Sequence, residues 1–111
     1  MNPKPELIQA IVEWFRAVAD ENRVRILMHL NQGECNVSTL VEELEIGQAS
    51  VSKHLSVLRQ AKIVEVRREG TQAFYSIRGE VPLQICSLIC KDVTEESKRL
   101  AKAYRTSNWE I

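Results

Sequence analysis

The segment between Gln48 and Arg59 constrains the fold more than any other part of this chain, because its apolar residues recur at helical spacing on one side only. Val51, Leu55 and Leu58 form that side. The other positions are short, polar or cationic: Gln48, Ser50, Ser52, Lys53, His54 and Arg59. The pattern predicts a helix that packs on a helical core and presents side chains suited to the major groove of DNA. A plain surface helix of a small bundle is the alternative.

Helical periodicity also predicts the elements upstream. It indicates three helices: one that follows Pro5 and ends near Ala19, one that Asp20 caps and that ends before Asn31, and one from about Ser38 to Glu45. Residues 34–37 are expected to be extended, and Ile46–Gly47 forms a turn. A helix, a short turn containing glycine and a second helix with polar contact positions constitute a helix-turn-helix.

A β-hairpin is predicted to follow directly. Residues 63–68 and 73–77 are rich in β-branched and aromatic side chains, and the residues between them favour a turn. A hairpin after such a helix is the wing of a winged helix, in which Arg67, Arg68 and Thr71 would contact phosphates or the minor groove. Any small hairpin can also carry arginines simply because its outer side is wet.

The last predicted helix opens at Gly79–Pro82 and has apolar residues on more than one face. We therefore expect it to be buried both against its own core and against a second copy of the chain. The chain then reads as one domain over 1–111, mainly α with a small β-hairpin. Helices within 1–19 and 81–106 would join two copies into a homodimer and hold two recognition helices on a palindromic DNA site.

Composition fits a globular protein, with 44% hydrophobic and 27% charged residues. The 15 basic and 15 acidic residues balance, but bases dominate between Ser50 and Arg78, which predicts one cationic edge. We expect a cytoplasmic protein with no membrane partner, since no signal peptide or spanning segment is visible. An enzyme is not expected, because the chain shows no phosphate-binding glycine loop, metal-ligand set or nucleophile with a base.

Three cysteines remain to be explained: Cys35, Cys86 and Cys90. Cys86 and Cys90 are four positions apart on one face of the last helix, so with Cys35 as a third thiol they would bind a thiophilic ion such as As(III). Alternatively a redox signal would join Cys35 to one of the others, since Cys86 and Cys90 on a regular helix fit disulfide geometry poorly. The third reading is that all three are small core residues.

The chain resembles the ArsR/SmtB family of bacterial repressors in three consecutive segments: Ala17 to Leu27, Gln48 to Arg59 and Arg67 to Tyr75. The run Ser52-x-His54-Leu55-x-x-Leu58-Arg59 is the most specific of them. The resemblance implies a winged-helix homodimer that leaves its operator when an inducer binds or oxidises it. It also implies that Gln48, Ser50, Ser52, Lys53 and His54 face DNA.

The sensing residues of that family are not reproduced here. Where metalloid-responsive members have a Cys-x-Cys pair, this chain has Asn36 and Ser38. Zinc-responsive members have a histidine among the ligands of the last helix, and this chain has none there, so we expect no such zinc site. Two alternatives to an inducible repressor stay open: a winged-helix module that binds another protein, and a repressor with no small-molecule inducer.

Overall fold

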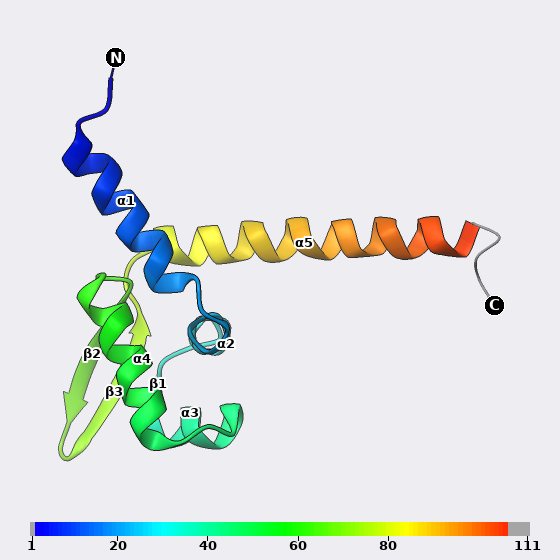
Figure 1. The fold of residues 1–111 in the computed structure, drawn as a ribbon. Coiled ribbons are helices and arrows are strands. Elements are labelled where there is room, and N and C mark those ends of the chain that lie inside the picture. The colour runs from blue at the N-terminus through cyan, green and yellow to red at the C-terminus, as the bar shows by residue number, and fades with distance from the viewer. Residues whose placement is uncertain (1, 107–111) are drawn as a thin grey trace.

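The computed structural model describes residues 2–106, and its first helix, α1 (Pro5–Val18), begins at a proline (Figure 1). Proline suits the first turn of a helix, where its missing N–H has no partner to lose. Only Ala17 of this helix is buried. Most of the apolar stripe on α1 is therefore uncovered in the single chain.

Asp20 starts the second helix, α2 (Glu21–Leu30), as the sequence predicts. Its side chain accepts a hydrogen bond of 3.1 Å from the backbone N–H of Arg23, which satisfies one of the donors left open at a helix start. Ile26, Leu27 and Leu30 form the buried face of α2. The helix ends in the turn at residues 31–32.

The helix-turn-helix consists of α3 (Val37–Leu44) and α4 (Gln48–Gln60), within a residue or so of the predicted bounds. The Asn36 side chain caps α3 by accepting from the Thr39 backbone N–H at 2.9 Å. The chain then reverses through Glu45, whose φ of 55° lies in the left-handed region. Gly47 precedes α4 in an extended conformation.

The sheet contains one strand more than the predicted hairpin. Strands β2 (Val64–Glu69) and β3 (Gln72–Ile77) form the hairpin, and β1 (Cys35–Asn36) pairs with β3, giving the antiparallel order β1-β3-β2. Gly70 opens the two-residue hairpin turn with a φ of 62°, a conformation that favours glycine. The extended stretch before α3 therefore becomes part of the sheet.

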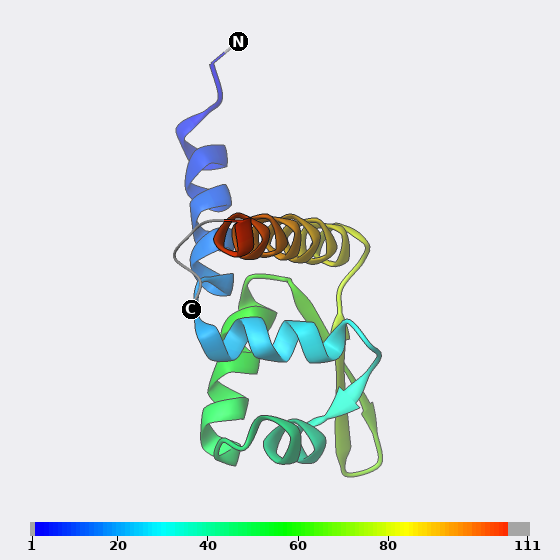
Figure 2. The same ribbon diagram turned by 90° about the vertical axis from the view of Figure 1, so that its right-hand side faces the viewer.

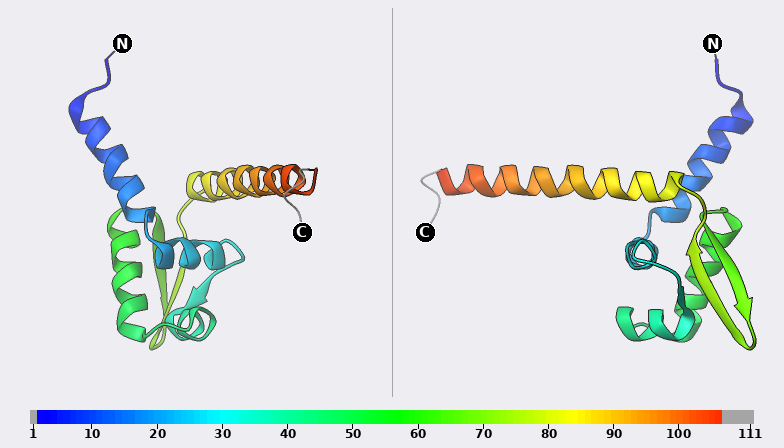
Figure 3. Two further views of the ribbon diagram at one scale, coloured as in Figure 1. Left: turned by 45° about the vertical axis from the view of Figure 1, so that its right-hand side comes forward. Right: turned by 180° about the vertical axis from the view of Figure 1, so that it is seen from behind.

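The last helix, α5 (Val81–Thr106), is 26 residues long and extends far beyond the rest of the domain (Figures 1 and 3). Its first turns pack on the core through Leu83 and Cys86. Beyond them, its apolar residues Leu88, Ile89, Val93 and Leu100 are all more than half exposed. Of the two buried sides that the sequence predicts, the single chain provides one. Among residues 2–106, no helix is long and apolar enough to cross a membrane.

The core lies between α2, α3, α4 and the sheet. Figure 2 shows α4 and the hairpin on opposite sides of it, with α5 seen end-on. Its completely enclosed side chains come from four different elements and the approach to the sheet: Ile26, Leu40, Val51, Leu55, Leu58, Ile63 and Val64. The core therefore determines how α4 and the hairpin stand relative to each other.

Candidate DNA interface

Helix α4 presents the polar residues of the predicted interface on its outer side. Val51, Leu55 and Leu58 are 0% exposed and hold the helix on the core. The polar positions are exposed apart from partly buried Ser50 and largely buried His54: Gln48, Ser50, Ser52, Lys53, His54 and Arg59. Gly47 has no side chain to cap α4, so the first N–H groups of the helix lack a side-chain acceptor.

The start of α4 and the tip of the hairpin lie at the same end of the molecule, away from α5 (Figures 1 and 3). The first turns of α4, around Gln48 and Ser52, and the turn containing Thr71 both belong to this end, with α3 between them in the view of Figure 2. Arg59 occupies the last turn of α4. At 1.5 Å per residue it is roughly 17 Å along the helix from Gln48, so it lies at the opposite end of α4 from the first predicted contacts.

An arginine on α2 ties the helix-turn-helix to the core. Arg25 Nη2 donates a hydrogen bond of 2.9 Å to the carbonyl oxygen of Leu44, the last residue of α3. Arg25 Nη1 donates to Asn22 Oδ1 at 3.3 Å, which orients the guanidinium. A cationic donor at a helix C-terminus satisfies an open carbonyl and complements the helix dipole. Arg25 therefore supports the turn that leads into α4.

His54 differs from the other predicted contacts on α4, because its side chain is only 13% exposed. Its Nδ1 lies 3.3 Å from Arg23 Nη1 and 3.8 Å from Asp20 Oδ2. The pKa of Asp20 is held below its ordinary value, mainly by the hydrogen bond from the Arg23 backbone and also by the charges of Arg23 and His54. The structure thus turns Nδ1 of His54 toward the start of α2, where it links α4 to that helix.

The two arginines of the hairpin have different surroundings. Arg68 and Thr71 are exposed near the tip, and Arg68 has no ion pair among residues 2–106. Arg67 is also exposed, but its guanidinium is engaged by two carboxylates, Glu34 at 2.8 Å and Glu69 at 2.7 Å. The sequence predicts both arginines as DNA contacts, and only Arg68 is left without a carboxylate partner in the described part of the chain.

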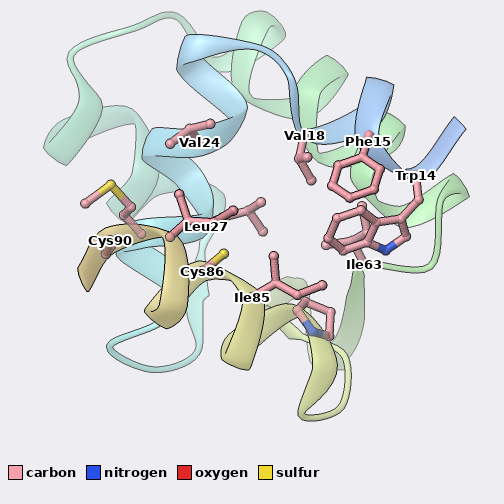
Figure 4. Close-up of a pocket in the computed structure, with 12 residues that line it drawn as sticks. Trp14, Phe15, Val18, Val24, Leu27, Ile63, Ile85, Cys86 and Cys90 are labelled. Atoms are coloured by element: carbon pink, nitrogen blue, oxygen red, sulfur yellow. The ribbon is translucent and has the colours of Figure 1, made fainter. Parts of the chain in front are cut away.

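Two of the three cysteines lie in one groove. Cys86 and Cys90 of α5 line an apolar depression of about 200 Å³ together with side chains of α1 and α2, and Figure 4 shows the Cys86 sulfur directed into it. The aromatic wall consists of Trp14 and Phe15. Cys35 does not line this groove, since it lies in β1 opposite Tyr75.

Partial burial raises the pKa values of two of the thiols, those of Cys35 and Cys86. Partial burial raises the pKa of Cys35, with a smaller contribution from the charge of Glu34. Burial also raises the pKa of Cys86, with a smaller contribution from Cys90. No three metal-ligating side chains come together within residues 2–106. A site with three thiols therefore does not form within the described part of one chain.

Sequence reasoning did not find several residues that organise this surface. Arg25, Arg23 and Glu34 all act on residues far away in the sequence, with separations of 19, 31 and 33 positions. Asp20 is the exception, since a helix cap is a local signal and its position was predicted correctly. No local pattern marks the other three.

Comparison with known proteins identifies the region that contains the helix-turn-helix. Residues 20–66 match the family model described as "Bacterial regulatory protein, arsR family". A similar curated protein is the HTH-type transcriptional regulator KmtR of Mycobacterium tuberculosis, 43% identical over 70 residues, which are 63% of this chain and 54% of the relative. The match therefore spans about half the length of that relative. The arsenical resistance operon repressor of Bacillus subtilis is 33% identical over 78 residues, covering 69% of this chain and 74% of the relative.

Solved structures share the fold over most of its length. A homodimeric winged helix-turn-helix DNA-binding domain from Mycobacterium bovis, described as a possible ArsR-family transcriptional regulator, superimposes with a TM-score of 0.83 at 28% identity. The match covers 89% of this chain and 92% of that one. The predicted winged helix-turn-helix fold is confirmed, and the relatives named here are transcriptional regulators.

Proposed function

This chain belongs to the ArsR family of bacterial DNA-binding regulators, and on that premise we propose that it is a repressor that binds a palindromic operator as a homodimer and leaves it when an inducer binds. The observation that carries the proposal is the division of α4 into a buried apolar side and a small, polar outer side. A protein-binding surface would more often expose an aromatic or aliphatic anchor at that place.

In the proposed complex, the first turns of α4 enter the major groove. Gln48, Ser52 and Lys53 stand exposed there, and such side chains can donate to or accept from base edges and phosphates. Helix α3 crosses the sugar-phosphate backbone of the DNA, as the first helix of a helix-turn-helix does. The hairpin tip, on the same end of the molecule, reaches the flanking phosphates through Arg68 and Thr71.

The uncovered apolar surfaces support the homodimer. On α1, Leu7, Ile8, Ile11 and Phe15 are exposed. On α5, the same is true of Leu88, Ile89, Val93 and Leu100. Two helices with contiguous exposed apolar residues are unusual in a monomer and typical of an interface. A twofold pairing of these helices would present two copies of α4 to one duplex, where successive major grooves about 34 Å apart would receive them on a palindrome.

The first test is direct DNA binding. Purified reduced protein is titrated onto labelled duplex from upstream of its own coding sequence, with unrelated duplex as competitor. We expect retention of the upstream duplex at competitor levels that remove unrelated DNA. Lys53→Ala and Ser52→Ala should change which mutated operator sequences the protein prefers. Arg68→Ala should instead lower the affinity for all sequences by the same factor and reduce the salt dependence of binding. Equal binding to upstream and unrelated duplex would contradict an operator-specific repressor.

We propose that the inducer is a thiophilic ion that binds to cysteine thiols. Cys86 and Cys90 lie one helical turn apart in the α1–α2–α5 groove, and Cys35 of a partner copy would supply the third thiol for As(III). Each thiol proton would leave with one hydroxide of arsenous acid as water, so the exchange needs no oxidant. The placement of the thiols disfavours the redox alternative within one chain, because Cys35 lies in β1 outside the groove and because Cys86 and Cys90, one turn apart on a helix, fit disulfide geometry poorly.

Arsenite and a mild oxidant distinguish these possibilities. Release of bound DNA by arsenite, abolished in Cys86→Ser and Cys90→Ser variants that still bind DNA, is the expected result. Dependence on Cys35 as well would indicate a three-thiol site. Release by the oxidant alone would establish the redox alternative, and DNA binding that resists both would leave a repressor without a thiol-dependent inducer.

A further inference from the structure

The two faces of the hairpin differ in character. Side chains alternate along a strand, so Arg67 shares a face with Glu65 and Glu69, while Arg68 shares the other face with Val64 and Val66. Val64 is 1% exposed and belongs to the core. The face of Arg67 is therefore the outer face of the sheet, and Arg68 continues the inner face, which is directed toward the helices.

Arg67 spans the outer face of all three strands. Its guanidinium carbon lies 4.9 Å from the ring centroid of Phe74 on β3, the residue directly opposite it in the register. Beyond the ring it meets Glu34, which precedes β1, with Nη2 donating to Oε1 at 2.8 Å and Nε donating to Oε2 at 3.1 Å. Such a two-point contact with a carboxylate fixes the orientation of both groups.

A second carboxylate uses the remaining side of the guanidinium. Arg67 Nη1 donates to Glu69 Oε2 at 2.7 Å, near the hairpin turn. The pKa of Glu34 is held below its ordinary value, mainly by its hydrogen bond with Arg67 and further by the charge of Arg67. All three nitrogens of Arg67 thus have carboxylate partners, and Glu65 adds another acid to the same face.

These contacts connect the hairpin to the start of the helix-turn-helix. Glu34 is two residues from Asn36, which caps α3 and also donates from Nδ2 to Gln72 Oε1 of β3 at 3.0 Å. The hairpin is otherwise held mainly by its base, where Val64 and Ile77 are buried. The Glu34–Arg67–Glu69 contact and the Asn36–Gln72 contact together hold its outer half.

Resting on the proposed function, we infer that Arg67 is a positioning residue that sets the angle of the wing, and that DNA meets the opposite face of the hairpin through Arg68. Glu34, Glu65 and Glu69 outnumber Arg67 and Arg78, the latter at the base of the hairpin, so the outer face is net negative and repels phosphates. The inner face near the tip carries a cation without a carboxylate partner in the described chain. Phosphates are therefore attracted to the inner face of the hairpin and repelled from its outer face, which orients the hairpin on DNA.

Salt dependence of DNA binding tests this assignment, because each phosphate contact contributes about 0.9 to the slope of log affinity against log salt. The key variant is Glu34→Gln with Arg67→Gln, which leaves the net charge of the chain unchanged. We expect its affinity for the upstream duplex to fall about two- to fivefold, the range for losing an exposed ion pair, with an unchanged salt slope. Arg68→Gln should instead flatten the slope.

The single variant Glu34→Gln should change the DNA affinity in opposite directions, depending on whether Arg67 positions the wing or contacts a phosphate. If Arg67 only positions the wing, Glu34→Gln weakens binding relative to Glu65→Gln, a matched change of charge on the same face that has no ion pair among residues 2–106. If Arg67 contacts phosphate, removing Glu34 releases it, and binding becomes tighter with a steeper slope. That result, or a flattened slope in the double variant, would overturn the inference.

The same experiment separates this inference from the proposed function. Wild-type protein that does not distinguish the upstream duplex from unrelated DNA would overturn the proposed repressor, and the docking of the wing with it. Wild-type protein that binds specifically while the Arg67 variants lose phosphate contacts would overturn only the positioning role.

Discussion

At the scale of single residues, Cys86 shows how burial changes chemistry that the sequence leaves open. Its thiol has a raised pKa in the folded chain, because burial disfavours the thiolate. On unfolding, the thiol regains its ordinary pKa and ionises more readily. The stabilisation from the neutral thiol is therefore complete below the unfolded pKa and is lost as the pH rises through that value toward the folded one.

We predict from this that Cys86 is alkylated slowly in the native protein. In a Cys35→Ser, Cys90→Ser background, the pH midpoint of iodoacetamide reaction at Cys86 should lie above that of the same chain in urea. Mass spectrometry of quenched samples would follow the reaction. Coincident native and denatured midpoints would show that the groove does not shield this thiol.

At the scale of elements, the two sides of α4 should be separable by mutation. Leu55 is 0% exposed, so Leu55→Ala should lower the free energy of unfolding by about 2–5 kcal/mol through lost contacts and a residual cavity. Lys53 is exposed, and Lys53→Ala should leave stability within about 0.5 kcal/mol while changing DNA recognition. Urea unfolding measures the stability of both variants, and titration with DNA measures their affinity. A large loss of stability in Lys53→Ala would contradict an outward-facing side chain.

The cap of α3 provides a second prediction for an element. Asn36 accepts hydrogen bonds from the backbone N–H and the hydroxyl of Thr39, both at 2.9 Å. Asn36→Ala should cost about 1 kcal/mol of stability, because the first turn of α3 loses its acceptor. Asn36→Asp retains an acceptor and should recover most of that loss in urea unfolding. If alanine and aspartate are equally destabilising, the amide contact with Gln72 is more important than the cap.

At the scale of the whole molecule, the exposed apolar surfaces of α1 and α5 should control assembly. Ile11 and Val93 are 47% and 57% exposed, so Ile11→Glu with Val93→Glu should convert a dimer to a monomer without disturbing the core. Light scattering would measure the mass. Operator affinity should fall at least tenfold, because two linked half-site contacts become independent.

Lys98→Glu is the matched control for that variant. It changes the charge of an exposed residue of α5 that lies two positions from Leu100 and therefore on the other side of the helix. We expect it to remain dimeric with unchanged operator recognition. A wild-type chain that is monomeric at the concentrations that saturate DNA would contradict the dimer altogether.

The sequence by itself determined the helices, the hairpin and their order. Helix periods, the Asp20 cap and the hairpin turn are signals between neighbours in the chain, and the predicted bounds agree with the structure to within a few residues. The buried side of α4 was predicted for the same reason, since three apolar residues at helical spacing can only lie on one side of a helix.

Only the tertiary structure decided which distant residues meet. The pairing of β1 with β3, the contact of His54 with the start of α2 and the capture of Arg67 by Glu34 join positions that no periodicity relates. The same is true of the groove, which gathers Cys86 and Cys90 but leaves Cys35 in the sheet. Such contacts depend on how the elements pack, and packing is settled by the shape and volume of the whole core rather than by any local pattern.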